Sequence, residues 1–538
     1  MTMKTKYIWL LAGIISFTAC SSDDDAALSV QPLPELTRGS ANFSTYVSLG
    51  NSLTAGYSDG ALFKIAQENS MPRILASQFA LTGGGEFTQP LTNDNVGGLL
   101  AGGSPLPGFG PRLVFDGAGP VPITNLNPGA TITTDIVLNN PTGPFNNMGV
   151  PGAKSYHLLA PNYGELSGLF ASPPTANPYF VRMASSSSTS VLADAMAQAP
   201  TFFSLWIGNN DVLGYAVSGG DGTNPITDQA TFDFAYNTLI STLTTGGTKG
   251  VVANIPNVAS TPHFTTVPYN PLSPLDPNFG PQIPTLNMVF GALNPIFSAV
   301  DPDRVIIFSE TDASAVVIKD ESLADISGII TQQLNNSPTF PAFLAQFGLP
   351  PSAAPTVAAY LGNAYGQSRQ ATPEDLFVLP SSKVIGTINT SSVAALMQQG
   401  FSQALAAQFS VEGVTLPLED KWVLIPSEQA EISAATASFN ATIQAAANNA
   451  DLAFVDANNI LNQLAQSGLQ SGDYILTSDL VTGGAFSLDG VHLTSRGYAA
   501  MANEFLKSID AKYNSNFEAS GHLVNIANFN TNYSAGLQ

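Results

Sequence analysis

Cysteine and basic residues are scarce in this chain of 538 residues, and each shortage excludes a class of protein. Cys20 is the single cysteine, so the chain can form neither an intramolecular disulfide nor a cluster of thiolate metal ligands. Lysine and arginine number 17 against 39 aspartate and glutamate residues, a formal net charge of −22. A surface with this charge repels polyanions, so we expect no nucleic-acid partner.

Charged residues of both signs are also few. They make up 10% of the chain, whereas 44% of the residues are hydrophobic and the mean hydropathy is +0.14. Intrinsic disorder requires the opposite balance, so most of the chain is expected to fold. Beyond residue 19 no apolar run reaches the length of about 18 residues that a membrane-spanning helix requires, and we expect no such helix there.

The amino-terminal segment has the pattern of a secretory signal. Lys4 and Lys6 precede an uncharged apolar run over residues 7–19, which is too short to cross a bilayer. The run ends in Phe17-Thr18-Ala19-Cys20, which resembles a bacterial lipobox, in which the cysteine becomes the lipidated first residue. We therefore expect a lipoprotein signal peptide over residues 1–19 and lipidation of Cys20. An ordinary signal peptide with an incidental cysteine is the alternative.

A polar stretch after Cys20 predicts a flexible acidic tether over residues 20–42. It begins Ser-Ser-Asp-Asp-Asp and has no apolar periodicity that could pack. Acidic residues directly after a lipidated cysteine resemble the surface-export signal of lipoproteins in the Bacteroidota, and a merely solvated linker is the alternative. The resemblance implies a lipid anchor in the outer membrane and a protein exposed at the cell surface.

The remaining chain, residues 43–538, alternates short apolar runs with helical patterns. Near-continuous apolar runs predict strands at residues 45–49, 201–207, 250–255, 304–308 and 452–455. Helices are predicted over residues 232–243 and 428–449, the second with Ser427 as its N-cap. This alternation is typical of an α/β three-layer sandwich with a mostly parallel sheet.

Two stretches fit this alternation badly and are predicted to be insertions. Residues 80–145 are rich in glycine, proline and asparagine, which predicts long loops on one face. Residues 260–425 contain short helical patterns interrupted by prolines, which we interpret as an insertion or cap rather than an independent domain. The apolar segment 288–297 favours an acyl-binding cap, although any buried helix has the same pattern.

Residues with the chemistry of a nucleophilic site follow two of the predicted strands. In an open α/β sheet, reactive groups gather at the carboxyl ends of the strands. Ser52 follows the first strand at a turn into a helix, where its hydroxyl could attack a carbonyl. Asn210 follows the second, and its side-chain amide could donate to a developing oxyanion. Between them, Gly152 lies in a segment whose backbone N–H could approach a substrate closely.

A candidate base lies near the carboxyl terminus. Asp489 precedes His492 by three residues, close enough for the carboxylate to hold Nδ1–H and leave Nε2 free to take a proton from a serine. The chain has only three other histidines, His157, His263 and His522. We expect these three to be core or surface residues without a catalytic role.

Taken in order, these segments resemble the four blocks of the GDSL/SGNH hydrolase superfamily. The blocks read Gly50-Asn51-Ser52-Leu53, a glycine segment at Gly152, Gly208-Asn209-Asn210-Asp211, and Asp489-Gly490-Val491-His492. The four named positions of the family fall on Ser52, Gly152, Asn210 and His492, and its triad acid falls on Asp489. Asn51 stands where the family has aspartate, and the blocks lie much farther apart than in compact members.

The resemblance implies a serine ester hydrolase that needs no metal and no organic cofactor. His492, oriented by Asp489, would activate Ser52, and the N–H groups of Ser52 and Gly152 with the Asn210 amide would form the oxyanion hole. The expected substrate is an acyl ester of a lipid or an acetylated glycan, so a lipase or carboxylesterase competes with a carbohydrate O-deacetylase. A non-catalytic surface binding lipoprotein is the alternative from another class.

Overall fold

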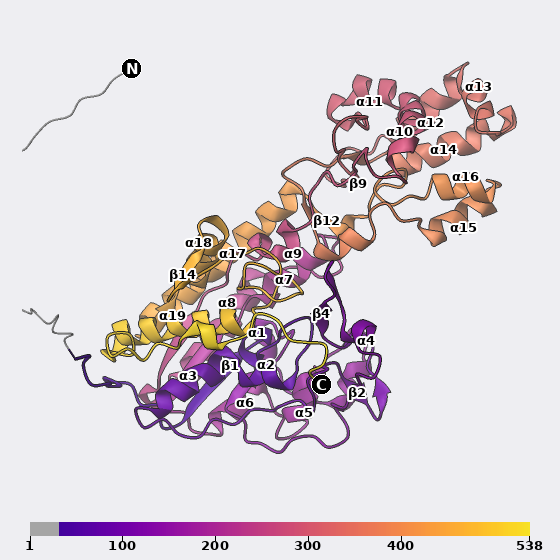
Figure 1. Ribbon diagram of the computed structural model, residues 1–538. Helices are drawn as coiled ribbons and strands as arrows, with labels where there is room; N and C mark the ends of the chain where they lie inside the picture. The colour runs from indigo at the N-terminus through magenta and orange to yellow at the C-terminus, as the bar shows by residue number, and fades with distance from the viewer. Residues whose placement is uncertain (1–31) are drawn as a thin grey trace, which may run out of the picture.

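The structure is a computed structural model that describes residues 32–538 (Figure 1). The predicted signal peptide over residues 1–19 and the lipidation site Cys20 lie outside the described residues, as does most of the predicted tether.

A parallel sheet of five strands forms the centre of the molecule. Its order is β13-β8-β7-β1-β6, and its strands are β1 (Tyr46–Gly50), β6 (Asn147–Gly149), β7 (Phe202–Trp206), β8 (Lys249–Ala253) and β13 (Ala453–Val455). The register places Gly50 of β1 opposite Trp206 of β7 and Gly149 of β6. The carboxyl ends of these three strands therefore meet at one edge, and four of the five predicted strands are confirmed.

Helices cover both faces of this sheet, which gives the molecule an α/β fold. Val47 and Leu49 of β1 face a core with α6 (Val191–Met196), α8 (Gln229–Leu243) and α17 (Pro426–Asn449). Tyr46 faces a second core with α3 (Met71–Ala80), α18 (Ala457–Gln466) and α19 (Ser495–Tyr513). Because both faces are buried, the strands consist of apolar residues almost without interruption.

The prediction of a strand at residues 304–308 is wrong. The segment is extended after a 3₁₀ turn (Pro302–Arg304), with Ile306 and Phe308 buried and Ile307 exposed between them. Side-chain amides take the place of a neighbouring strand, since Ile306 N–H donates to Asn294 Oδ1 at 3.0 Å and Phe308 N–H donates to Asn287 Oδ1 at 2.9 Å. The apolar pattern therefore reflects one buried face of an isolated extended segment.

The N-cap of α17 also differs from the prediction. The helix begins at Pro426 with Ile425 as its N-cap, so Ser427 lies inside the first turn. Proline at the first helical position has its φ angle already fixed for the helix. The carboxylate of Glu428 completes the cap by accepting the Ile425 N–H at 2.8 Å.

Residues 80–145 form long loops with little regular structure, as predicted. They include two short hairpins and one helical turn: β2 (Leu100–Ala101), β3 (Ser104–Pro105), β4 (Leu113–Phe115), β5 (Pro120–Pro122) and α4 (Ile123–Leu126). Arg112 is fully buried among them, and its guanidinium donates to the carbonyls of Tyr533, Ser534 and Leu537. It thereby attaches the carboxyl-terminal tail to these loops.

Most of the predicted insertion over residues 260–425 forms a lobe that projects away from the sheet (Figure 1). The helices of the lobe are α10 (Ile283–Gly291), α11 (Asn294–Val300), α12 (Ser327–Asn336), α13 (Phe340–Ala345), α14 (Ala354–Tyr365), α15 (Thr390–Gln398) and α16 (Gln403–Gln408). They enclose an apolar core of their own, which includes Phe290, Phe297, Ile330 and Leu361. The lobe thus does not depend on the sheet for the burial of its apolar residues.

Two small antiparallel pairs join the lobe to the rest of the molecule. They are β9 (Val317–Lys319) with β10 (Ser368–Gln370), and β11 (Leu376–Phe377) with β12 (Val423–Leu424). Arg369 of β10 pairs with Asp320 and with Asp375, each at 2.6 Å. All three side chains are largely buried, so removing one partner would leave a buried charge unpaired.

None of the helices in the described part of the chain is long and apolar enough by itself to cross a membrane. One bent pair, Gly280–Gly291 with Asn294–Val300, has the length and composition when the two segments are counted together across a bend of 54°.

Candidate active site

Ser52 lies at the turn between β1 and the helix that follows it. It is the first residue of the short helix α1 (Ser52–Ala55), and the side chain of Asn51 caps that helix by accepting the Leu53 N–H at 3.0 Å. Asn51 therefore provides the hydrogen bond that an aspartate would provide. Gly50 permits the turn, because a Cβ at this position would lie 2.4 Å from the carbonyl oxygen of Trp206.

Ser52, His492 and Asp489 form a continuous hydrogen-bonded relay. His492 Nε2 lies 2.8 Å from Ser52 Oγ, and His492 Nδ1 lies 2.9 Å from Asp489 Oδ2. With the proton on Nδ1, the ring donates to the carboxylate and Nε2 accepts from the serine hydroxyl. This is the tautomer in which a histidine acts as a general base.

Backbone N–H groups hold Asp489 in its ionised form. Its Oδ1 accepts from Val491 and His492, each at 2.8 Å, and its Oδ2 also accepts from Gly60 at 2.8 Å. Burial by itself raises the pKa of Asp489, but the charge of His492 and these hydrogen bonds outweigh it and lower the pKa well below its usual range. The carboxylate therefore stays available to orient and stabilise His492.

Tyr57 and Asp59 contact the loop that contains Asp489 and His492, although neither residue was selected from the sequence. The Tyr57 ring lies 4.5 Å from the His492 ring, and its hydroxyl donates to the Gly60 carbonyl at 2.6 Å. Asp59 Oδ1 accepts the Leu488 N–H at 3.0 Å, which fixes the residue before Asp489. The available signal was the Asp59-Gly60 pair, a turn sequence in which both residues have positive φ, 51° and 76°.

Asp59 is buried, and its surroundings disfavour the ionised form of its carboxyl. Burial raises the pKa of its carboxyl to about 7, the hydrogen bond from Leu488 opposes this, and the nearby charge of Asp489 adds to it. A second carboxyl with a raised pKa thus lies next to the loop that contains Asp489 and His492.

Of the three candidate oxyanion donors, Ser52 and Asn210 line one cavity, and Gly152 is not part of its wall. Asn210 begins α7 (Asn210–Val217), and its Nδ2 donates one hydrogen to the Ala153 carbonyl at 2.9 Å, which leaves the second for a ligand. Gly152 has a φ of +82°, the left-handed conformation that favours glycine. Within residues 32–538, no acceptor is hydrogen-bonded to the backbone N–H of Ser52 or of Gly152.

Asp211 connects the start of α7 to the turn that contains Gly152. Its carboxylate, which is fully buried, accepts from Ser155 N–H and Ser155 Oγ, each at 2.8 Å. The Gly152 turn is tied to the end of β1 as well, because Val150 N–H donates to the Gly50 carbonyl at 3.0 Å. Ser52, Gly152 and Asn210 are thus held on segments that are bonded to one another.

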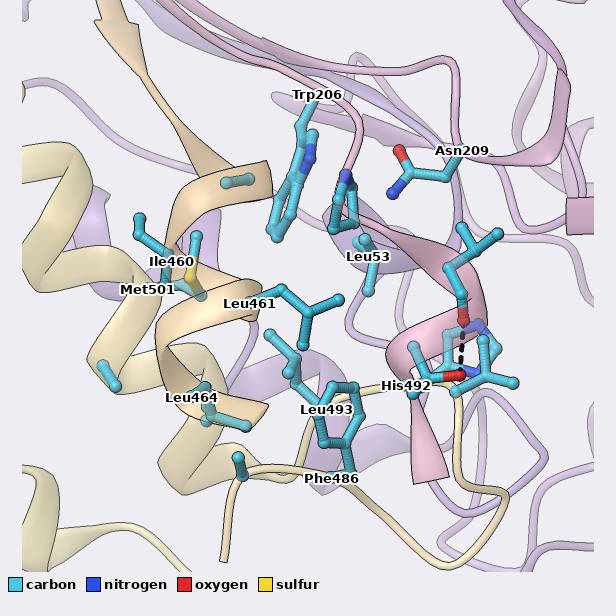
Figure 2. A pocket seen from close by; sticks show the side chains of 18 of the residues that line it. Leu53, Trp206, Asn209, Ile460, Leu461, Leu464, Phe486, His492, Leu493 and Met501 are labelled. Carbon is cyan, nitrogen blue, oxygen red and sulfur yellow. Dashed lines mark hydrogen bonds between the residues drawn. The ribbon is translucent and has the colours of Figure 1, made fainter. Parts of the chain in front are cut away.

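Ser52, Asn210 and His492 line a single cavity of about 70 Å³ (Figure 2). Of the predicted insertion over residues 260–425, only Thr261 contributes to its wall among the described residues. The segment 288–297 instead packs into the core of the lobe through Phe290 and Phe297. The prediction that this segment forms an acyl-binding cap is therefore wrong for this cavity.

The remaining histidines have structural contacts. His157 Nδ1 accepts the Lys154 N–H at 3.0 Å, and burial lowers the pKa of His157 to about 4. His522 Nδ1 lies 2.9 Å from Ser520 Oγ. His263 lies closer to the relay than expected, with Nδ1 at 3.2 Å from the Asp489 carbonyl oxygen.

One group of side chains among the described residues has the spacing of a metal-ligand set, and it lies away from the relay. The carboxylates of Glu321, Asp420 and Glu428 approach within 4.8 Å of one another. Burial and the neighbouring carboxylates raise the pKa of Asp420 to about 7 and that of Glu428 to about 9. The closely spaced carboxylates thus oppose the ionisation of Asp420 and Glu428.

Comparisons with protein-family models, with curated proteins and with solved structures find no significant match to this chain. The positions of Ser52, His492 and Asp489 and the cavity beside them are therefore the basis for assigning a function.

Proposed function

We propose that this protein is a serine ester hydrolase with the fold and site of the GDSL/SGNH superfamily. The single observation that carries the proposal is the relay from Ser52 Oγ through His492 to Asp489, with distances of 2.8 and 2.9 Å. Ser52 lies 437 positions before Asp489 and 440 before His492, yet the three residues meet at the carboxyl edge of a parallel sheet, where such folds bind their ligands.

In the acylation step, Ser52 Oγ forms a bond to the ester carbonyl carbon while its proton passes to His492 Nε2. The negative charge develops on the carbonyl oxygen, where the N–H groups of Ser52 and Gly152 and the free hydrogen of Asn210 can stabilise it. Collapse of this intermediate breaks the bond to the alcohol oxygen. The alcohol leaves with the proton from His492, and Asp489 stabilises the imidazolium in between.

In the deacylation step, a water molecule gives its proton to His492 Nε2 and attacks the carbonyl carbon of the acyl-enzyme. The same three donors face the oxyanion again. The bond to Ser52 Oγ then breaks, the serine recovers the proton from His492, and the carboxylic acid leaves. The cycle uses one ester and one water and needs no other reactant.

A carbohydrate O-deacetylase, the alternative activity, would use the same steps and would differ only in its substrate. Location in the outer membrane through a lipid on Cys20 suits either activity and remains part of the proposal. A binding lipoprotein without activity would not require a serine, a histidine and an aspartate in register for proton transfer.

Hydrolysis of p-nitrophenyl esters, from acetate to palmitate, tests the proposal. Residues 21–538, which include all of the described chain, are compared with the variants Ser52→Ala and Ser104→Ala, the second at an exposed serine. We expect hydrolysis that disappears in Ser52→Ala alone. Equal rates in the wild type and Ser52→Ala, or none in a folded wild type, would reject the proposed chemistry.

A further inference from the structure

We infer that the cavity beside Ser52 is an acyl-chain site, and that the preferred substrate is an ester of a fatty acid longer than acetate. This inference rests on the proposed ester hydrolysis and adds its substrate class. It excludes the acetylated glycan as the preferred substrate, because an acetyl group would leave the cavity unfilled.

The cavity has one polar end, and that end is the candidate active site. The side chains with polar groups in its wall are Ser52, Asn209, Asn210, Thr261 and His492, apart from the indole of Trp206. Two of these groups are already used elsewhere: Thr261 Oγ1 donates to the Val258 carbonyl at 2.9 Å, and Trp206 Nε1 donates to the Asn254 carbonyl at 3.2 Å. Trp206 therefore presents its apolar ring to the cavity.

The rest of the wall is apolar, and much of it comes from two helices and a hairpin that follow one another in the chain. Helix α18 contributes Ala457, Ile460, Leu461 and Leu464, which lie on one face at helical spacing. Helix α19 contributes Ala500 and Met501, and the hairpin of β14 (Leu469–Ser471) and β15 (Tyr474–Leu476) contributes one leucine from each strand. These side chains form a hydrocarbon surface that begins at the nucleophile.

Leu464 and Met501 mark the part of the cavity far from the chemistry. In Figure 2 they lie on the side away from the dashed hydrogen bond to His492, with Leu461 between. Both are more than nine-tenths buried, so this part of the cavity lies inside the molecule. A chain that enters from Ser52 therefore loses contact with water as it lengthens.

An acyl chain fits this surface better than a polar alcohol does. A sugar or glycerol moiety brings hydroxyl groups, and each would lose its hydrogen bonds to water without finding a partner beyond Asn210. A fatty acyl group needs its polar contacts only at the carbonyl carbon, where the oxyanion donors lie. The alcohol then leaves from the solvent side of Ser52.

Chain-length dependence of ester hydrolysis is the first test. Burial of each additional methylene is expected to raise kcat/KM about fourfold until the chain reaches the far wall. We expect this rise between p-nitrophenyl acetate and octanoate, below the concentrations at which the esters aggregate. A flat profile, or acetate as the best substrate, would overturn the inference.

Two neighbouring residues of α18 provide a matched pair of variants. Leu464→Trp fills the far part of the cavity, whereas Ala465→Trp adds the same ring on the exposed side of the helix. We expect Leu464→Trp to lower the ratio of kcat/KM for octanoate to kcat/KM for acetate at least tenfold. Ala465→Trp should leave the whole profile unchanged. Acetate hydrolysis reports whether each variant is folded, and Leu464→Ala, which enlarges the cavity, should move the optimum to longer chains.

The side of the ester that enters the cavity is tested with two matched substrates. Ethyl octanoate places the long chain on the acyl side, and octyl acetate places it on the alcohol side. We expect ethyl octanoate to be hydrolysed faster, and only this substrate to be sensitive to Leu464→Trp. The reverse order would overturn the acyl assignment.

Binding without catalysis separates this inference from the proposed function. Residues 21–538 contain two tryptophans, Trp206 in the cavity wall and Trp422, so the double variant Ser52→Ala, Trp422→Phe has a single fluorophore at the site. We expect decanoic acid to change its emission and butanoic acid not to. Binding in a protein that hydrolyses no ester would reject the hydrolase but support the hydrocarbon site. Hydrolysis with no decanoic acid binding would do the opposite.

Discussion

Helix α10 in the lobe and helix α18 in the body each bury an apolar face, but the two faces have different surroundings. In α10 the buried face meets other side chains: the Phe290 ring lies 5.4 Å from the Tyr365 ring and 5.8 Å from the Phe308 ring. In α18 a similar face borders a cavity that leads to Ser52. Apolar periodicity identifies a buried face, and the neighbouring elements decide whether that face completes a core or lines a site.

The same comparison separates the two parts of the molecule. The lobe encloses its own apolar core, and the body encloses the relay and the cavity. Changes in the body should therefore alter catalysis, and changes in the core of the lobe should alter stability with little effect on catalysis. The following predictions are ordered from the largest expected effect to the smallest.

Replacement of the base should have the largest effect on catalysis. We expect His492→Ala to lower kcat at least about 10⁴-fold, because Ser52 then has no proton acceptor. His522→Ala is the matched control, since His522 contacts Ser520 and does not line the cavity. Steady-state hydrolysis of p-nitrophenyl octanoate measures both. Comparable losses in the two variants would show that the effect is not specific to the relay.

Loss of one oxyanion donor should have a smaller effect. We expect Asn210→Ala to lower kcat by about 10²–10³ with KM little changed, because the donor acts on charge that develops in the transition state. The exposed Asn224 lies on the loop after α7 and provides the control Asn224→Ala. A change confined to KM would indicate that Asn210 binds the ground state instead.

Substitutions in the core of the lobe should lower the stability of the protein. We expect Phe290→Ala to lower the free energy of unfolding by about 3–5 kcal/mol, because the side chain is fully buried. Met288→Ala on the same helix should cost far less, because Met288 is 41% exposed. Thermal unfolding measures the loss, and kcat below the transition should stay within twofold of the wild type. Loss of activity in folded Phe290→Ala would break the division between lobe and body.

Asp59 should make stability depend on pH around neutrality. Its folded-state pKa of about 7 lies above the ordinary value of 3.8, so its contribution to stability is complete below about pH 4 and is lost as the pH rises through 7. Asp59→Asn keeps the acceptor for the Leu488 N–H and cannot ionise. As the pH rises from 5 to 8, we expect the free energy of unfolding of Asp59→Asn to increase by about 1–3 kcal/mol relative to that of the wild type.

Urea unfolding at the two pH values measures this gain. Asp473→Asn, at an exposed position in the turn between β14 and β15, is the control and should show no such gain. If the free energy of unfolding fell equally with rising pH in the wild type and in Asp59→Asn, Asp59 would not be the group whose ionisation lowers stability.

Sequence patterns were sufficient to predict the strands that contain a continuous apolar run. Four of the five strands of the sheet were predicted because both of their faces are buried. Strand β6 was missed because it has only three residues, Asn147, Met148 and Gly149, and no apolar run. The false strand at residues 304–308 has the right alternation, but its N–H groups bond to Asn287 and Asn294, a long-range contact that no local pattern contains.

The candidate catalytic residues were easier to predict from the sequence than the residues that hold them in place. Ser52, Asn210, Asp489 and His492 occur in short sequence blocks with recognisable chemistry. Asp59 was not found, because its role depends on a hydrogen bond to Leu488, 429 positions away. The segment 288–297 was interpreted as an acyl-binding cap for a related reason: an apolar helical face has the same pattern whether it meets a neighbour, as it does here, or a ligand.

Covalent labelling of Ser52 tests the central claim most directly. A fluorophosphonate reacts with a serine only when a neighbouring base activates it, and peptide mass spectrometry locates the adduct. We expect one adduct per chain on the peptide that contains Ser52, none in Ser52→Ala, and a much slower reaction in His492→Ala. An unlabelled wild-type protein, or an adduct on another serine, would contradict the account.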